Sequence, residues 1–85
     1  MSEKRIGKVT HYFDKIQVIV LDLRATLQVG DTVHFLGHGS DFTQTVESLQ
    51  IEHESVEKAG PKQEVAMKIN QPIHRNTQVF KVLEP

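Results

Sequence analysis

The stretch DFTQTVESLQIEHESVEKA, which spans residues 41–59, decides the fold because its apolar residues fit two different patterns. One set recurs at the spacing of a helix face: Val46, Leu49, His53 and Val56. Leu49 and Ile51 also alternate with polar neighbours, as they would in a half-buried strand. A helix over residues 43–58 would make the chain an α+β domain, whereas a strand would leave it all-β. The residue pattern by itself is compatible with both.

Five segments around this stretch have the alternation and the β-branched and aromatic content that are typical of strands. They cover residues 6–13, 15–23, 32–36, 64–69 and 78–83. Turn-forming residues separate them, and loops are expected at residues 14–15, 29–31, 37–41, 59–62 and 70–72. The short connection at Asp14-Lys15 predicts that the first two segments pair as a β-hairpin.

Length and composition place the chain among small folded proteins. Its 85 residues predict a single domain over residues 1–85, and 38% hydrophobic residues are enough to build a core. The chain has no cysteine, so neither disulfides nor a thiolate zinc site can support that core. The N-terminus is polar, and the longest apolar run, Val18–Leu21, is too short to cross a bilayer. We therefore expect a cytoplasmic protein that has no membrane contact.

The order of motifs along the chain resembles domain 2 of elongation factor Tu and other translational GTPases. It is most similar to small stand-alone proteins called translation elongation factor-like proteins. The similarity extends from about Arg5 to Val82, and the matching residues are Val29-Gly30-Asp31, Val46–Ile51 and Val56–Ala59. A second, looser resemblance is to the C-terminal barrel of collagenase-like peptidases and their tRNA-modifying relatives, through residues 29–37 and 41–47.

The resemblance implies an all-β protein: a six-stranded, closed or nearly closed β-barrel of the elongation factor domain-2 type. It also implies that Thr43–His53 is a strand. Val46 and Leu49 are separated by an odd spacing, so both can face the core only if a bulge lies near Glu47–Ser48. Where many relatives carry a Gly-Asp turn before the last strand, this chain has Arg75-Asn76-Thr77, and Asn76 can still adopt the left-handed conformation.

The usual signatures of catalysis are missing from the sequence. No G-x-x-x-x-G-K-[ST] stretch is present to hold a nucleotide, and no serine lies in a G-x-S-x-G context. The chain has five histidines but no H-E-x-x-H motif. His34 and His38 lie on a predicted strand and loop, where residues four apart are roughly 13 Å from each other, too far to share one ion. We therefore expect no enzyme activity, no metal and no cofactor.

Basic residues in the first hairpin make RNA contact the preferred hypothesis. Basic side chains interleaved with aromatic rings can pair with phosphates and stack on bases. The predicted RNA-binding residues are Lys4, Arg5, Lys8, His11, Tyr12 and Lys15. The elongation-factor resemblance implies the ribosome, ribosomal RNA or tRNA as partners. The formal net charge of -1 argues against strong non-specific binding to nucleic acid.

The alternative is a protein-interaction adaptor that makes no RNA contact. The loop at residues 37–42 places an aromatic side chain beside a glycine-rich tip, and such loops often carry recognition. The predicted interaction residues are His38, Asp41 and Phe42. Phe42 fits equally well as a packing residue, and its burial would favour that role.

Overall fold

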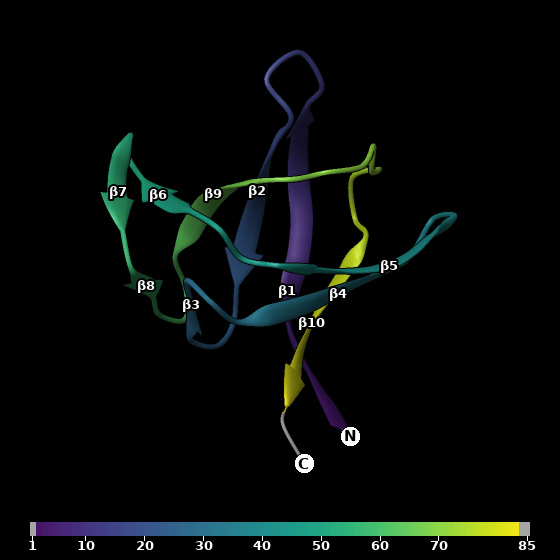
Figure 1. Ribbon diagram of the computed structural model, residues 1–85, viewed down its shortest axis with the longest axis horizontal. Helices are drawn as coiled ribbons and strands as arrows, with labels where there is room; N and C mark the ends of the chain where they lie inside the picture. Colours follow the sequence, from purple (N-terminus) through teal and green to yellow (C-terminus); the bar gives the residue numbers. More distant parts are fainter. Residues whose placement is uncertain (1, 84–85) are drawn as a thin grey trace.

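The structure, a computed structural model, describes residues 2–83 and contains ten β-strands and no helix in that range. The prediction of an all-β protein is confirmed (Figure 1). The chain has more strands than the six expected, because several short pairs occur between the long strands. In chain order the strands are β1 (Ser2–Phe13), β2 (Val18–Leu23), β3 (Leu27–Gln28), β4 (Thr32–Gly37), β5 (Ser40–Thr45), β6 (Leu49–Ile51), β7 (Glu54–Val56), β8 (Lys58–Ala59), β9 (Glu64–Lys68) and β10 (Gln78–Leu83).

The ambiguous stretch at residues 41–59 forms short strands rather than a helix, with a turn at Glu52-His53, where both residues have positive φ. The single strand expected over Thr43–His53 is wrong in its bounds, because residues 46–48 belong to no strand. On one side of this break β5 pairs with β4, and on the other side β6 pairs with β7 and β9. Val46 and Leu49 are both buried at 1% exposure, so the break achieves what the expected bulge would have done.

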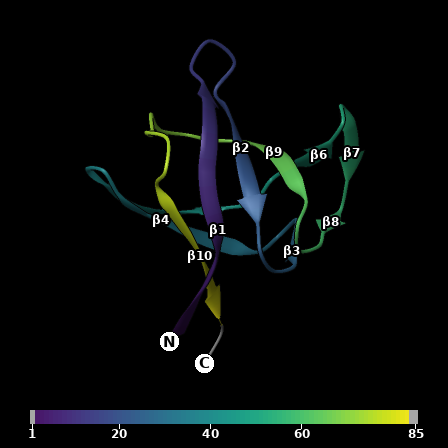
Figure 2. The same cartoon turned by 180° about the vertical axis from the view of Figure 1, so that it is seen from behind.

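Eight strands form one antiparallel sheet in the order β5-β4-β10-β1-β2-β9-β6-β7, and β3 pairs with β8 separately. The sheet curls around a common core, as Figure 1 and the view from behind in Figure 2 show. Strand β5 ends the sheet on one side. The side chain of its residue Gln44 nevertheless forms hydrogen bonds with the last residue of β9 and with the segment that follows. Its Nε2 donates to the carbonyl of Lys68 at 2.7 Å, and its Oε1 accepts from the amide of Asn70 at 3.0 Å.

Strands β1 and β2 form a long hairpin that projects from the sheet (Figure 1). Its register shifts once, between Val9 and His11, and the ladder of β1 with β10 shifts between Arg5 and Gly7. Gly7 is required here, because a Cβ atom at this position would lie 2.2 Å from the backbone oxygen of Asp22. The turn of the hairpin covers residues 14–17 and therefore begins at the predicted connection.

The core is a cluster of buried side chains contributed by most of the strands. Phe35 is its largest fully buried side chain. The loop expected at residues 37–41 is shorter than predicted: His38 and Gly39, both with positive φ, make the turn, and Ser40 and Asp41 already belong to β5. The left-handed conformation expected at Asn76 is confirmed by its φ of 69°.

Candidate functional site on the first hairpin

The outward side of the β1–β2 hairpin carries the most exposed apolar side chains of the described residues. Phe13 is 49% exposed and Ile16 is 65% exposed. The ring of His11 stacks on that of Phe13, with centroids 6.1 Å apart and planes inclined by 26°. Exposed apolar groups that gather at one place on a small protein often mark a contact surface.

Strand register extends this surface across the neighbouring strands. Phe13 lies opposite Val18, and Val18 lies opposite Lys68 on β9. The flanking residues Ile19 and Met67 are buried at 0% and 1% exposure, so alternation directs Val18 and Lys68 away from the core. We call the surface formed by His11, Phe13, Ile16, Val18 and Lys68 the hairpin face.

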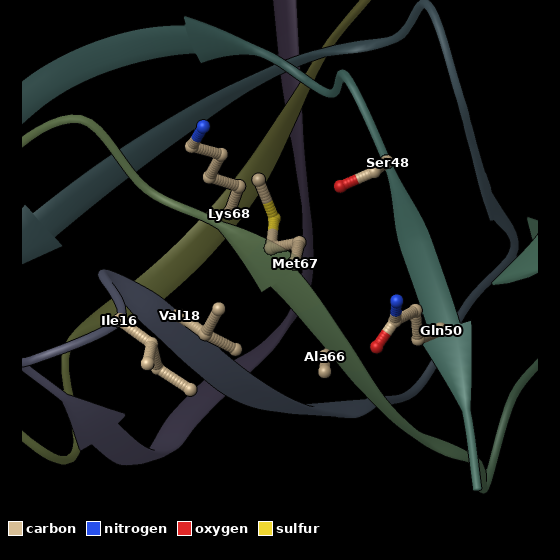
Figure 3. Close-up of a pocket in the computed structure, with 7 residues that line it drawn as sticks. All are labelled: Ile16, Val18, Ser48, Gln50, Ala66, Met67 and Lys68. Carbon is tan, nitrogen blue, oxygen red and sulfur yellow. The ribbon is translucent and has the colours of Figure 1, made fainter. Parts of the chain in front are cut away.

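A hollow lies beside the hairpin face (Figure 3). Strands β6 and β9 pair there at one position, Gln50 with Ala66. Beyond that pair the two strands are not hydrogen-bonded to each other, which leaves room for the hollow. In Figure 3, Ser48 and Gln50 form one wall and Ile16 and Val18 the opposite wall, with β9 between them. One wall therefore offers hydroxyl and amide groups, and the other offers apolar carbon. Lys68 lies at the rim.

The predicted RNA-binding residues are spread along β1 rather than gathered at one end. Lys4 and Arg5 begin the strand, whereas Lys15 lies in the turn at the far end. At about 3.3 Å per residue, roughly 30 Å separates Lys4 from Phe13, the last residue of β1. Of the predicted set, His11 lies on the hairpin face and Lys15 lies in the adjoining turn.

Three of the other predicted residues of β1 face groups within the protein, whereas Lys4 lies opposite another lysine, Lys81 of β10. Arg5 donates a hydrogen bond to the side-chain oxygen of Gln78. Lys8 lies opposite Asp22 in the β1–β2 ladder. Tyr12 is half-buried and packs against the core.

Lys68 joins the hairpin face although the sequence analysis did not select it. The strand that carries it was predicted, but its position beside β2 depends on the order of strands in the sheet. Only the register between β2 and β9 brings Lys68 next to Val18. No local sequence signal could have identified it.

The predicted protein-interaction loop is largely engaged in contacts within the protein. Asp41 Oδ1 lies 2.5 Å from His34 Nε2. Phe42 is half-buried, packs against the core and stacks at a tilt on Phe35, with centroids 5.1 Å apart. That burial favours the packing role for Phe42. His38 is exposed at the tip of the turn.

Residues 2–83 contain no group of three or more histidine, cysteine, aspartate or glutamate side chains that could hold a metal ion. Within the same range, no helix is long and apolar enough to cross a membrane.

Comparison with known proteins identifies relatives for nearly the whole chain. Residues 2–77 match the C-terminal domain of peptidase family U32. The chain is 30% identical over 80 residues to an uncharacterized protease of Methanocaldococcus jannaschii, covering 93% of this chain and 20% of that relative. The chain thus spans about a fifth of the length of this curated protein.

Solved structures resemble the fold closely. A crystal structure of the C-terminal domain of a Geobacillus thermoleovorans protein, described as a U32 peptidase, superposes with a TM-score of 0.88 at 25% identity. The match covers 94% of this chain and 93% of the other. The selenomethionine variant of that domain gives a TM-score of 0.85 at 25% identity, covering 89% and 96% of the two chains.

These relatives support the looser of the two resemblances seen in the sequence, the one to the C-terminal barrel of collagenase-like peptidases. None of them is a translation factor, so they lend no support to the resemblance to elongation factor domain 2. The family match over residues 2–77 covers most of the chain, and it includes both the hairpin face and the hollow beside it. The chain belongs to the family of C-terminal domains of peptidase family U32.

Proposed function

We propose that this protein is a non-catalytic binding module whose hairpin face contacts single-stranded RNA, as in a tRNA end or an exposed ribosomal loop. The observation that carries the proposal is the exposed His11–Phe13 stack with lysines on both sides. Phe13 is 49% exposed, Lys15 lies in the adjoining turn, and Lys68 is in the same cross-strand row as Phe13.

The chemistry of the surface suits a single strand. Unpaired bases stack on aromatic rings with little sequence preference, and lysines pair with the phosphates between them. The polar wall of the hollow, Ser48 and Gln50, could accept or donate hydrogen bonds at a base edge. Double-stranded RNA would instead be recognised by its shape and its 2′-hydroxyls.

The relatives suggest where catalysis would reside. The protease-named relative has about four-fifths of its length outside the region matched by this chain. A separate catalytic part would then perform the reaction while this module holds the substrate. The resemblance to tRNA-modifying relatives supports RNA as that substrate, and the proposal includes a translation-associated role for the module.

The same proposal includes the shape of the sheet, a nearly closed barrel of the elongation factor domain-2 type. Its support is the bridge at Gln44, whose amide replaces a backbone ladder between β5 and the end of β9. A side-chain amide has the same donor and acceptor as a peptide group, so it can join two strand edges. A rigid barrel would present the hairpin face in a fixed geometry.

The test is binding to labelled single-stranded RNA and to bulk tRNA, measured by fluorescence anisotropy from low to physiological salt. We expect affinity to fall as salt rises, because phosphate contacts release counterions. The Phe13→Ala/Lys15→Ala/Lys68→Ala variant should lose this binding. The control Lys58→Ala/Lys62→Ala removes two exposed lysines that lie away from the hairpin face and should bind normally. No binding at low salt would reject RNA as the ligand.

A protein partner is the second candidate, and the exposure of Ile16 favours it. An aliphatic side chain at 65% exposure gains more from an apolar protein surface than from a nucleotide. The net charge of -1 adds no general attraction for phosphate. Absence of RNA binding together with capture of one partner by the wild type, but not by Ile16→Ser, would favour this candidate.

A further inference from the structure

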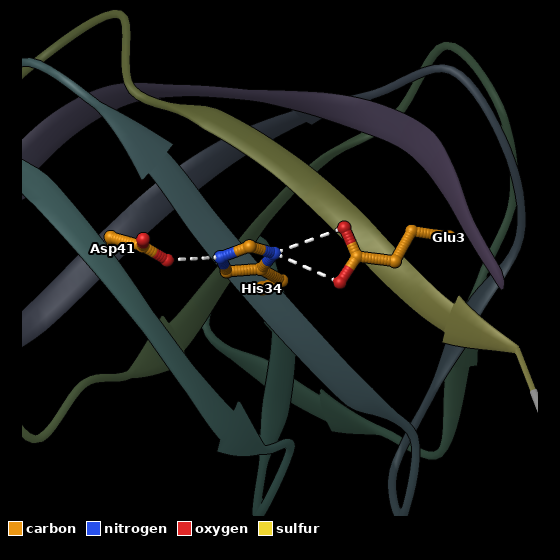
Figure 4. Close-up of polar contacts among 3 residues, drawn as sticks. All are labelled: Glu3, His34 and Asp41. Atoms are coloured by element: carbon orange, nitrogen blue, oxygen red, sulfur yellow. Dashed lines mark hydrogen bonds and ion pairs between the residues drawn. The ribbon is translucent and has the colours of Figure 1, made fainter. Parts of the chain in front are cut away.

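Three side chains from three strands meet on the outer surface of the sheet, away from the hairpin face (Figure 4). His34 of β4 lies between two carboxylates. Its Nδ1 is 3.0 and 2.9 Å from the two carboxylate oxygens of Glu3 on β1. Its Nε2 is 2.5 Å from Oδ1 of Asp41 on β5. We call Glu3, His34 and Asp41 the imidazole staple.

With both carboxylates ionised, the geometry fits only a doubly protonated ring. A neutral imidazole carries a single N–H and can donate to only one of the two carboxylates, whereas the imidazolium ion donates to both. Hydrogen bonds that the ring donates to Glu3 and to Asp41 raise the pKa of His34 from 6.5; burial opposes them, and the two negative charges add to the rise. The side chain of His34 is only 17% exposed, so water competes weakly for its two nitrogens.

Few other charges face the ring. Phe80 of β10 lies beside it with a centroid distance of 6.3 Å, and Thr43 lies opposite it on β5. Arg5 of β1 occupies the same cross-strand row beyond Phe80, and its guanidinium is bonded to Gln78. The neighbours of His34 along β4 on the same face, Thr32 and Leu36, do not titrate. Glu3 and Asp41 therefore dominate the electrostatic environment of the ring.

The two strands that the staple joins are each paired on one side only where it holds them. Residues 2–5 of β1 pair with β10 but not with β2, whose ladder with β1 starts at Gly7. Strand β5 ends the sheet and pairs only with β4. Segments with so few partners open most readily. A link between them would hold two segments that each lack a second strand partner.

We propose that the imidazole staple is a pH-operated fastener that holds the β4–β5 hairpin and the first residues of β1 against the sheet. While His34 is protonated, Asp41 is engaged and β5 is secured. As pH rises through the pKa of His34, the ring loses one N–H and releases one carboxylate. The tip of the hairpin then loosens. The proposal is independent of any RNA ligand.

The first measurement is an NMR titration of the His34 ring protons in the intact protein, with and without the staple partners. We expect His34 to titrate above 6.5, and Glu3→Gln and Asp41→Asn each to lower its midpoint, because each substitution removes a negative charge at nearly constant shape. Asp14→Asn, an exposed carboxylate in the β1–β2 turn, is the matched control and should leave the midpoint unchanged. A midpoint at or below 6.5 in the wild type would overturn the proposal.

The second measurement is amide hydrogen exchange of β5 across the same pH range. Protection factors remove the intrinsic pH dependence of exchange, and the amides of β2, which lies inside the sheet, serve as an internal reference. We expect β5 protection to fall several-fold relative to β2 as His34 deprotonates. In the Glu3→Gln/Asp41→Asn variant β5 protection should be low at every pH. If His34 titrates as expected but β5 protection does not follow, the ion pair is a surface contact and the fastener is rejected.

Discussion

The two long hairpins of this protein differ in how far their side chains are exposed or bonded within the protein. The β1–β2 hairpin leaves Phe13 and Ile16 exposed at its end. The β4–β5 hairpin exposes Leu36 less, at 40%, and bonds two of its polar side chains internally: Asp41 contacts His34, and Gln44 bonds to Lys68 and Asn70. In Figure 1 the two hairpins project from the sheet in different directions, so one contact would not readily cover both.

The β1–β2 hairpin can therefore gain free energy by binding a partner, whereas the polar groups of the β4–β5 hairpin already have hydrogen-bond partners. Apolar groups left in water gain free energy from any partner that covers them, at about 25 cal/mol per Å². Polar groups that already have internal partners gain little, because a new hydrogen bond only replaces an old one. We therefore expect ligand contact at the first hairpin and control of local order at the second. The predictions below test this contrast, beginning with the largest effect.

Gly7→Ala should produce the largest loss of stability. The added Cβ would lie 2.2 Å from the backbone oxygen of Asp22, and backbone atoms in a paired strand cannot move aside cheaply. We expect a cost of about 3 kcal/mol in urea unfolding, at the upper end of the effects of overpacking. Gly60→Ala is the control, because its Cβ would meet nothing closer than the side chain of Gln63 at 3.8 Å. Equal stability of the two variants would mean that the β1–β2 hairpin is not rigidly held.

Gln44→Ala should follow, with a loss of about 2 kcal/mol in the same assay. The substitution leaves the carbonyl of Lys68 and the amide of Asn70 without their partner, and unsatisfied backbone groups cost about 1–3 kcal/mol when buried. Gln71→Ala, at an exposed position of the neighbouring loop, should cost little. A neutral effect of Gln44→Ala would show that β5 does not depend on the bridge, and it would weaken the proposal of a nearly closed barrel.

The long strands of this fold could be predicted because their information is local. Alternation and turn residues identified β1, β2, β4, β9 and β10. The stretch at residues 41–59 could not be resolved in the same way. Its strands are short and change partners at residues 46–48, and that change depends on contacts between segments distant in sequence. The sequence predicted that Val46 and Leu49 would both be buried. It did not predict that the strand would be interrupted at residues 46–48.

The candidate site was predictable only in part, for the same reason. His11 and Lys15 were selected from the composition of the first hairpin, whereas Lys68 reaches the hairpin face through strand register. The imidazole staple joins residues 3, 34 and 41, which belong to three separate segments. In the sequence, His34 stands out only as a potential metal ligand together with His38. The contacts of His34 with Glu3 and Asp41 depend on which strands lie side by side in the sheet, and the order of residues along the chain does not give that arrangement.

The free energy of unfolding should depend on pH through His34, and this change should be smaller than the losses expected for Gly7→Ala and Gln44→Ala. The pKa of His34 is raised in the folded state, so the staple contributes fully below pH 6.5, the usual value, and its contribution is lost as pH rises through the folded pKa. Glu3 and Asp41 are 36% and 73% exposed, so screening by water limits the effect to about 1 kcal/mol or less. Urea unfolding at a series of pH values should show this loss in the wild type and not in His34→Gln. A wild-type curve parallel to that of the variant would contradict the assignment.

Phe13→Ala should have the smallest effect on stability and a large effect on binding. About half of the Phe13 side chain is already in water, and its main contact is the stack with His11, so we expect a change of about 0.5 kcal/mol. Phe42→Ala is the matched comparison from the second hairpin. Phe42 packs against the core and Phe35, so its loss should cost about 2 kcal/mol or more while leaving ligand binding by the folded protein unchanged. If both variants lost stability equally, Phe13 would be a structural residue, and the distinction between an open hairpin and a satisfied one would fail.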